Sequence, residues 1–175
     1  GCLGPDGTSN GACGPAPRAT GGEGGYVFND GDGTTAWDVE KAIQLGSFDS
    51  AFHETSLDVQ PLPFASLEGD YPQFNGRGYP DTLKPGPLPP PPSGGGAPSQ
   101  LLDSKIAVTA GQTLLLRLSN VGLDRFWTIT AAGLTLKSVG TGARHRRGPT
   151  GKNLYVDSAS INFGGGESID VLVDT

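Results

Sequence analysis

The chain has 175 residues, of which 29 are glycine and 15 are proline, and its formal net charge at pH 7 is −6. Phosphate backbones bind basic faces, so this acidic balance argues against a nucleic-acid partner. Only 35% of the residues are hydrophobic, and no apolar run approaches the length of a membrane span. We therefore expect one domain, with a modest core under long loops.

The first 36 residues form a Gly/Pro-rich segment that we separate from the domain at residues 37–175. The chain contains no methionine, so we expect Gly1 to be a processed or excised end. Cys2 and Cys13 are the only cysteines, and two thiols without a neighbouring histidine make a poor metal site. We predict a disulfide that closes a small loop, with free thiols as the alternative. A disulfide implies an oxidising location, which we expect to be extracellular, periplasmic or at the cell surface.

Asp30, Asp32 and Asp38 stand at a spacing that resembles the start of a calcium-binding loop. Such a loop needs glycine at its sixth position and glutamate at its twelfth, where this chain has Thr35 and Lys41. A loop of that type is therefore rejected. A solvated turn and a loose carboxylate site stay open as alternatives.

The first half of the chain carries weak strand signals that turn residues separate. We predict short strands over Tyr26–Phe28 and Glu40–Gly46, the second in competition with a helix. A further alternating run places Leu57 and Val59 on one face and ends at Pro61. A proline-rich stretch at about residues 80–100 predicts an extended connecting loop, with a polyproline ligand as the alternative.

Apolar residues alternate with polar ones in the second half of the chain, at the period of two that predicts strands. Glycine-containing breaks separate these runs, so we expect several short strands, as in a β-sandwich or barrel. Arg117 is expected on the face opposite its leucine neighbours. The residues predicted to share a face within each run are Ile106 and Val108; Leu114, Leu116 and Leu118; Trp127 and Ile129; Leu134 and Leu136; and Ile169, Val171 and Val173.

Candidate binding and catalytic groups are few. The segment Arg144–Arg147 is the one dense basic cluster of an acidic chain, and it predicts either a solvated loop or a contact surface for an acidic partner. Gly164–Ser168 lacks the lysine and the helix of a phosphate-binding loop, so it predicts a tight connection into the last strand. His53 and His145 are the only histidines, and their spacing prepares neither an activated nucleophile nor a copper site.

Two long segments resemble the central domain of multicopper oxidases. The first runs from "FHETSLDVQ" to "NGRGYPDTL", and the second contains "GQTLLLRLSN", "RFWTITAAG" and "GGGESIDVLVD". Together they cover roughly residues 40–175, apart from the proline-rich loop, and they look most similar to large bacterial members of the family. The resemblance implies an all-β fold, a cupredoxin-like Greek-key β-sandwich.

The resemblance implies a structural role for two motifs. In the first motif glycines allow tight turns between strands, and Arg77 and Tyr79 pack locally or face a neighbouring domain. Neither motif is implied to be catalytic. The signature residues are Asn75, Gly76, Arg77, Gly78, Tyr79 and Pro80 in the first motif, and Gly164, Gly165, Gly166 and Glu167 in the second.

The histidine motifs that hold copper in the family, HxH, HxxHxH and HCHxxxH, do not occur in this sequence. The resemblance therefore implies a copper-free central domain or fragment. The parent oxidase would use copper to oxidise phenolic or metal-ion substrates while it reduces oxygen to water. We expect this chain alone to hold no cofactor and to be non-catalytic. The alternative is a non-enzymatic binding or assembly module, and the expected partners are flanking cupredoxin domains or a chain that donates a strand.

In the family, the block that corresponds to "ESIDVLVDT" is followed by a loop and one more strand that completes the sheet. This chain stops at Thr175. We therefore expect the strand that contains Ile169, Val171 and Val173 to lie at an unpaired sheet edge, where an added strand would bind.

Overall fold

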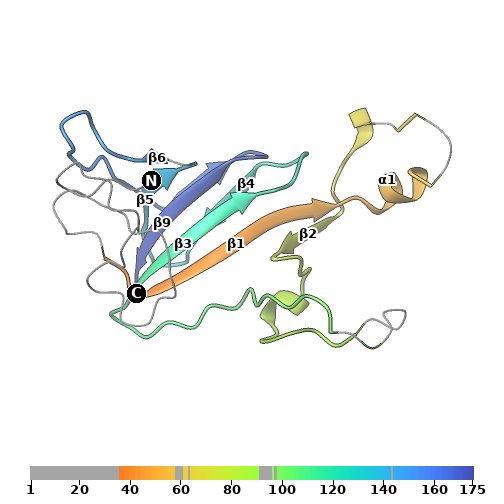
Figure 1. Ribbon diagram of the computed structural model, residues 1–175, viewed down its shortest axis with the longest axis horizontal. Coiled ribbons are helices and arrows are strands. Elements are labelled where there is room, and N and C mark those ends of the chain that lie inside the picture. The colour runs from red at the N-terminus through yellow and green to blue at the C-terminus, as the bar shows by residue number, and fades with distance from the viewer. Residues whose placement is uncertain (1–35, 58–60, 63, 91–95, 97, 143) are drawn as a thin grey trace, which may run out of the picture.

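The computed structural model describes residues 36–57, 61–62, 64–90, 96, 98–142 and 144–175. Cys2, Cys13 and the predicted strand Tyr26–Phe28 lie outside these residues. The described residues form two β-sheets that pack face to face, with long connections at one side (Figure 1).

The larger sheet has seven strands, and all of its pairs are antiparallel except β1–β3. Its main order is β2 (Tyr71–Phe74), β1 (Val39–Phe48), β3 (Thr113–Asn120), β9 (Ser168–Asp174), β5 (Leu136–Thr141) and β6 (Arg144–His145), and β7 (Val156–Ser158) also pairs with β5. The smaller sheet consists of β4 (Trp127–Thr130) and β8 (Ser160–Phe163).

The core lies between the two sheets and is built from alternate residues of their strands. Ile43 is opposite Leu118 in the pair β1–β3, and Leu116 is opposite Val171 in the pair β3–β9, so register keeps these side chains on one face. Each Å² of apolar surface buried in this way stabilises the fold by about 25 cal/mol. The buried members of the core are Ile43, Leu45, Leu114, Leu118, Leu136, Ile161, Phe163, Val171 and Val173.

The opposite face of the larger sheet, here called the outer face, carries an ion network. Arg117 donates from Nε to Glu40 at 2.6 Å and lies 3.5 Å from Asp170. Burial raises the pKa of Asp170, and the positive charge of Arg117 offsets part of that rise. A small apolar cluster lies on the same face: Trp37, Leu115, Val139 and Leu172, with Tyr155 packed against it.

The alternating runs predicted β1, β3, β4 and β9 correctly, and Arg117 lies opposite the inward-facing leucines as expected. The next strand, β5, begins only at Leu136, so Leu134 lies in the connection before it. The basic cluster, interpreted as a loop, contributes its first two residues to β6. β7 and β8 were not predicted.

The strand predicted around Leu57 is wrong in its described part. Residues Ser50–Thr55 form helix α1, and Leu57 lies in the turn that follows. Asp49 caps this helix by accepting a hydrogen bond from the Phe52 N–H at 2.8 Å, which satisfies an amide that the first turn leaves unpaired. Val59 lies outside the described residues.

The strand predicted at Ile106 and Val108 is also wrong. Both residues lie in a segment that pairs with no strand among the described residues, although Ile106 still packs against the core. Alternation places the side chains, but a strand also needs a partner backbone.

The expectation of an unpaired edge at the end of the chain is wrong as well. β9 pairs with β3 on one side and with β5 on the other, and both pairs are antiparallel. The last strand in sequence is therefore interior in the sheet. Because both of its edges already have partners, no donated strand can pair with it along these registers.

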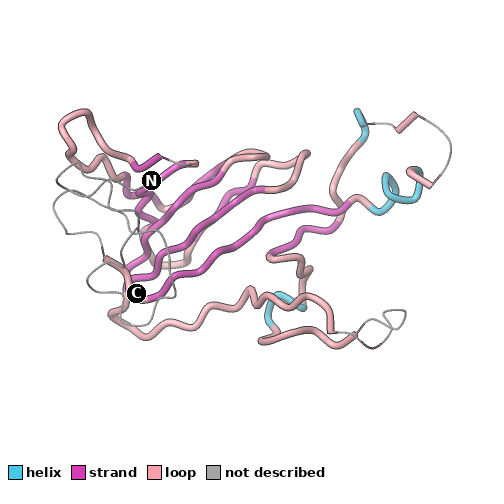
Figure 2. The backbone as a smooth tube through the Cα atoms, viewed as in Figure 1, coloured by secondary structure: helices cyan, strands magenta, loops and turns pink. Residues whose placement is uncertain are grey.

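Loops make up most of the region between β2 and β3 (Figure 2). This connection contains a short 3₁₀ helix at Asp81–Leu83 and one isolated antiparallel bridge between Leu88 and Ser99. A second 3₁₀ turn, Phe64–Ser66, precedes β2. The predicted long loop at residues 80–100 therefore carries some local order where it is described.

Candidate functional site

The first signature motif begins with a two-residue hairpin turn. Asn75 and Gly76 have φ values of +51° and +74°, and Phe74 and Arg77 exchange two backbone hydrogen bonds of 2.9 Å across them. Positive φ at both central residues is the geometry of the Asn-Gly hairpin turn. A Cβ on Gly76 would meet the Gln100 Oε1 at 2.4 Å, a contact that the flexible Gln100 side chain can relieve, so the positive φ rather than space favours glycine here.

The side chain of Asn75 continues the pairing of β1 beyond the hairpin. Its Oδ1 accepts the Gln44 N–H at 2.8 Å, while its Nδ2 donates to the carbonyls of Ala42 and Asp103 at 3.3 Å each. One amide side chain thus acts in place of a peptide group at the edge of β1 and links that edge to the long loop.

Arg77 is the most deeply buried charged residue of the motif, with 1% of its surface exposed. Its guanidinium donates to the carbonyl of Leu102 at 2.7 Å, of Lys84 at 2.7 Å and of Gln100 at 2.8 Å, and also to that of Gly86. A buried charge is tolerated only when its donors are satisfied. Arg77 therefore ties residues 84–86 and 100–102 to the hairpin, and we call this arrangement the Arg77 anchor.

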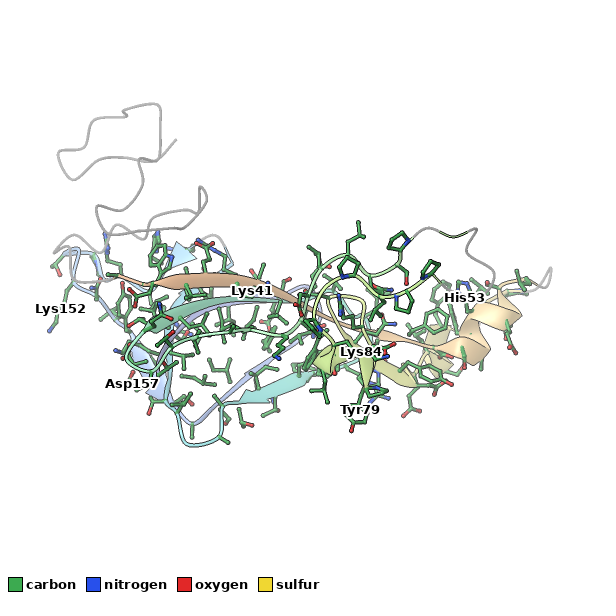
Figure 3. All side chains as sticks on the ribbon, turned by 90° about the horizontal axis from the view of Figure 1, so that it is seen from below. Lys41, His53, Tyr79, Lys84, Lys152 and Asp157 are labelled. Carbon is green, nitrogen blue, oxygen red and sulfur yellow. The ribbon has the colours of Figure 1, made fainter. Side chains whose placement is uncertain are left out.

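Asp103 adds a carboxylate beside the Arg77 anchor. Hydrogen bonds from the N–H of Lys105 at 2.7 Å and of Gly86 at 3.2 Å lower the pKa of Asp103, and the positive charge of Arg77 lowers it further. Tyr79 is 82% exposed and projects from the same motif (Figure 3). Its bond to Pro80 is cis. The motif thus combines a buried cation with an exposed aromatic ring.

The second motif, Gly164–Glu167, is a tight turn into β9. Glu167 closes it twice: its Oε2 accepts the Gly164 N–H at 2.5 Å, and its own N–H donates to the Gly164 carbonyl at 3.2 Å. A Cβ on Gly165 would lie 2.4 Å from the carbonyl oxygen of Gly122, so the backbone of another loop fills that space.

Asn120 joins this turn to the β3–β4 loop, and only 2% of its surface is exposed. Its backbone exchanges hydrogen bonds of 2.9 Å with Gly166 and Glu167, and its Oδ1 accepts the Gly122 N–H at 2.9 Å. Its Nδ2 donates to the carbonyl of Arg125 at 2.8 Å and, more weakly, to that of Phe163 at 3.4 Å. We call this arrangement the Asn120 anchor. Sequence reasoning missed it, although Asn before a glycine-containing turn is a usable signal.

The loop held by the Asn120 anchor exposes apolar side chains. Val121, Leu123 and Phe126 are 56%, 85% and 77% exposed, and the Phe126 ring would lie 3.0 Å from a Cβ on Gly164. Exposed apolar side chains mark a contact surface where they form one contiguous patch.

Asp124 ties the same loop to Ser47, near the C-terminal end of β1. Burial works to raise the pKa of Asp124, but the hydrogen bonds from the Ser47 hydroxyl and the Gly69 N–H, both 2.6 Å, outweigh it, so the pKa is lowered. A Cβ on Gly69 would lie 2.2 Å from the Ser47 Cβ, which shows how closely these segments approach.

We expect Asp124→Asn to weaken the fold in a pH-dependent way. A carboxylate whose folded-state pKa is lowered stabilises the fold above its usual pKa of 3.8, and this contribution is lost as the pH falls through the lower folded-state value. The variant should be less stable by about 1–2 kcal/mol at neutral pH, with the difference shrinking below pH 3.8. Urea unfolding of both proteins across acidic pH checks this.

Asp70→Asn is the matched control, because Asp70 is exposed and, among the described residues, accepts one hydrogen bond of 3.1 Å, from the Ser50 hydroxyl. Its stability difference should stay small at every pH. A pH-independent loss in Asp124→Asn would contradict the electrostatic explanation.

The two histidines do not meet. His53 lies on α1 with its ring 5.1 Å from the Phe48 ring, whereas His145 lies on β6 at the other end of the sheet (Figure 1). Burial lowers the pKa of His145, and the charges of Arg147 and Arg117 lower it further. Within the described part of the chain, no three His, Cys, Asp or Glu side chains are grouped so as to hold a metal ion.

Of the three aspartates of the rejected calcium loop, Asp38 lies among the described residues. Asp30 and Asp32 lie outside the described residues. Asp38 accepts the Thr113 N–H at 2.8 Å and thereby pairs the entry of β1 with the start of β3. Its carboxylate thus has a structural hydrogen bond.

Described residues line two of the surface hollows. One, of about 370 Å³, lies on the outer face and is called the outer trough; the other, of about 310 Å³, is bounded by residues 65–68, 124 and 125. The outer trough is lined by Ala36, Thr113, Lys137, Asn153, Tyr155, Asp157, Leu172 and Asp174.

Comparison with known proteins identifies a fold. No family model and no curated protein matches the sequence. Among solved structures, a mutant of the laccase from B. aclada matches with 18% identity and a TM-score of 0.50 over 81% of this chain and 24% of its own. Fet3p, a multicopper oxidase that functions in iron import, gives 14% identity and a TM-score of 0.53 over 81% and 22%. The multicopper oxidase mgLAC matches with 12% identity and a TM-score of 0.52, over 77% of this chain and 33% of its own.

The chain therefore spans between about a fifth and a third of the length of these oxidases. No helix among the described residues has the length and apolarity needed to cross a membrane. The resemblance seen in the sequence is confirmed at the level of fold: this chain has a cupredoxin-like β-sandwich similar to one found in solved multicopper oxidases.

Proposed function

We propose that residues 37–175 are a copper-free structural domain of a multicopper oxidase, which spaces and orients the domains that bind copper. The observation that carries the proposal is the cupredoxin-like sandwich, matched over most of this chain but only 22–33% of each oxidase. Such coverage fits one domain among several. The placement of His53 and His145 at opposite ends of the sheet supports a role without a copper site of its own.

The two anchors support a spacing role. The Arg77 anchor and the Asn120 anchor each tie described loop segments to neighbouring elements through the hydrogen bonds of one buried side chain. These loops present Tyr79 in one case and Leu123 and Phe126 in the other, all more than three-quarters exposed. Fixed loops with exposed apolar side chains suit contact with a flanking domain at a defined angle.

The chemistry of the parent protein belongs, in this proposal, to its other domains. They would hold the copper, oxidise phenolic or metal-ion substrates and reduce oxygen to water. The location would be extracellular, periplasmic or at the cell surface, where the proposed Cys2–Cys13 disulfide would persist.

We expect the 175-residue chain to take up no stoichiometric copper and to show no blue absorption band. A mononuclear blue copper site requires two histidines and a cysteine close together. Metal analysis and visible spectroscopy after copper loading and dialysis measure both quantities. The parent polypeptide, expressed with the segments that its gene encodes on either side, should bind copper and oxidise a phenolic substrate.

A His53→Ala, His145→Ala double variant is the control for adventitious uptake, and it should leave both measurements unchanged in the isolated chain. Stoichiometric copper with a blue band in the isolated chain would overturn the proposal. So would a gene that encodes no histidine-rich copper motif beside this chain.

A further inference from the structure

One half of strand β1 has an open edge. β1 has ten residues, whereas β2, its partner on the side away from β3, has four and pairs with residues 45–48 of β1. Beyond β2 the Asn75 side chain binds Gln44 and Ala42, and the pairing ends there. Figure 1 shows β1 continuing past β2 toward its N-terminal end, with no strand of the described residues on that side. This open stretch, residues 39–43, is here called the β1 edge.

The alternation of the backbone shows which groups of the β1 edge are free. The Leu45 carbonyl accepts an N–H from the continuation of β3 at 2.8 Å, so the odd-numbered residues of β1 face β3. Gln44 faces the other way, because it donates to Asn75 Oδ1 and accepts the Asn75 N–H, both at 2.8 Å. The N–H and C=O of Glu40 and the N–H of Ala42 point to that same side, and no described residue bonds to them.

These groups can be reached from solvent. Ala42 is exposed, and the Glu40 side chain is 23% exposed. Figure 3 is turned so that this side of the molecule faces the reader, with Lys41 labelled on it. The loop that leads into β3 carries Ile106 to the core between the sheets and forms no backbone hydrogen bond with the β1 edge. An open edge with free backbone groups is a template for another strand.

Lys41 gives the β1 edge a cation that the described residues leave without an ion pair. The nearby carboxylate of Asp103 is already occupied. It accepts the N–H groups of Lys105 at 2.7 Å and of Gly86 at 3.2 Å, which lower its pKa more than the charge of Lys41 does. The ammonium group of Lys41 is therefore available to an acidic residue of an added strand.

The geometry of an added strand fixes where that acidic residue must stand. An antiparallel strand that bonds to Glu40 and Ala42 places its central residue directly opposite Lys41, in the close, non-hydrogen-bonded kind of pair. Opposite charges in such a pair stabilise the sheet. The two flanking residues lie beside Glu40, which already pairs with Arg117 at 2.6 Å, and beside the small side chain of Ala42. Uncharged, strand-forming residues suit both positions.

A second copy of this chain does not fit the β1 edge. Two antiparallel registers pair the free groups of two copies, and they place either Glu40 opposite Glu40 or Lys41 opposite Lys41. Like charges directly opposite each other destabilise a strand pair. The next register would include Gln44, whose backbone groups Asn75 already binds. The charges of the edge thus act against self-pairing and favour a different chain.

We propose that the β1 edge accepts an extended, acidic segment of a separate partner protein as an added antiparallel strand. The central carboxylate of that segment lies opposite Lys41, and the residues on either side of it exchange backbone hydrogen bonds with Glu40 and Ala42. Backbone bonds supply affinity in this mode of binding, and the side-chain pair supplies specificity. The inference rests on the geometry of the edge and not on the function proposed above.

The test uses NMR of the ¹⁵N-labelled full chain. In the free chain the amide hydrogens of Glu40 and Ala42 should exchange much faster than those of Lys41 and Ile43, which face β3. The blocked peptide acetyl-Thr-Val-Glu-Thr-Val-amide should shift the Glu40 and Ala42 signals to saturation and slow their exchange. The same peptide with Lys in place of Glu should bind at least about fivefold more weakly.

Matched variants separate the charge from the backbone pairing. In Lys41→Glu the preference between the two peptides should reverse, whereas Lys152→Glu, at an exposed position outside β1, should leave it unchanged. N-methylation of the Thr that follows Glu removes the donor to the Glu40 carbonyl, and it should abolish binding. N-methylation of the peptide Glu, whose N–H points away from β1, should keep affinity within about threefold. This second comparison requires no change in the protein.

Several results would overturn the proposal. Slow exchange of the Glu40 and Ala42 amides in the free chain, at every protein concentration, would mean that the chain itself fills the edge. Protection that grows with concentration, together with a doubled solution mass, would identify a second copy as the occupant. The absence of a saturable shift at Glu40 and Ala42, equal binding of the two N-methylated peptides, or an unreversed preference in Lys41→Glu would each reject an added acidic strand.

Discussion

Arg77→Leu is expected to destabilise the domain more than any other single substitution outside the apolar core, by about 4 kcal/mol or more. The change removes a guanidinium that is 1% exposed and leaves the carbonyls of Lys84, Gly86, Gln100 and Leu102 without their donor. Each unsatisfied buried polar group costs about 1–3 kcal/mol, and hydration of the loosened loop recovers only part of this sum. The midpoint of urea unfolding at constant slope measures the loss.

Two further variants test whether the stability of the domain depends on the planar guanidinium of Arg77 rather than on its charge alone. Arg77→Lys keeps one cation but cannot reach four carbonyls in different directions, so it should lose most of the same stability. Arg125→Leu is the surface control, because the Arg125 side chain is 42% exposed and only pairs with acidic groups at 3.4 and 3.8 Å. It should cost less than about 1 kcal/mol.

Hydrogen exchange locates the effect of the Arg77 substitutions. The amide of Leu88, bonded to the Ser99 carbonyl at 2.9 Å, lies in the loop that the anchor holds. Its exchange should accelerate strongly in Arg77→Leu, while exchange in β3 and β9 follows only the global loss of stability. Uniform acceleration throughout the sheet would argue against a local anchor.

The sequence predicted strands well where one face of a strand is buried and the other is solvated. Leu114, Leu116 and Leu118 alternate with Arg117, and this period of two holds whatever the neighbouring strand is. β8 carries the same signal, with buried Ile161 and Phe163 separated by exposed Asn162, but the run is too short to be convincing without knowledge of its partner.

Pairing is the property that a single segment does not encode. Ile106 and Val108 alternate like a strand, yet they have no partner backbone among the described residues. β9 was expected at an edge because the resemblance implies one more strand after it, but β9 lies between β3 and β5, which both precede it in the sequence. Spatial order in an antiparallel sandwich differs from sequence order, so edges cannot be assigned by counting strands.

The residues of the candidate sites also differ in whether the sequence alone reveals their role. Asn75 and Gly76 are recognisable because a hairpin turn with positive φ demands these residue types. The burial of Arg77 was not predictable, because its acceptors are backbone carbonyls up to 25 residues away, which leave no trace in residue identity. Arg147 and Arg144 look equivalent in the sequence of the basic cluster. Only the structure shows that Nε and Nη2 of Arg147 are buried whereas Arg144 is exposed.

Asn120→Ala is expected to cost about 2–4 kcal/mol, the second largest effect of a polar substitution in this domain. The side chain is held where β3 ends, with its residue 2% exposed, and truncation removes the partners of the Gly122 N–H and the Arg125 carbonyl together. The backbone bonds from Asn120 to the Gly164–Glu167 turn stay possible, so the turn should persist while the β3–β4 loop loosens. Faster hydrogen exchange of the Gly122 amide than of the Gly166 amide would show that the loop loosens before the turn.

Asn162→Ala is the matched control. It removes the same kind of side chain from an exposed position on β8, where the amide donates to the Thr128 hydroxyl at 3.3 Å. It should change the free energy of unfolding by less than about 0.5 kcal/mol. If both alanine variants lost the same stability, burial of the Asn120 amide would not be the cause, and the loop that presents Leu123 and Phe126 would owe its geometry to something other than this anchor.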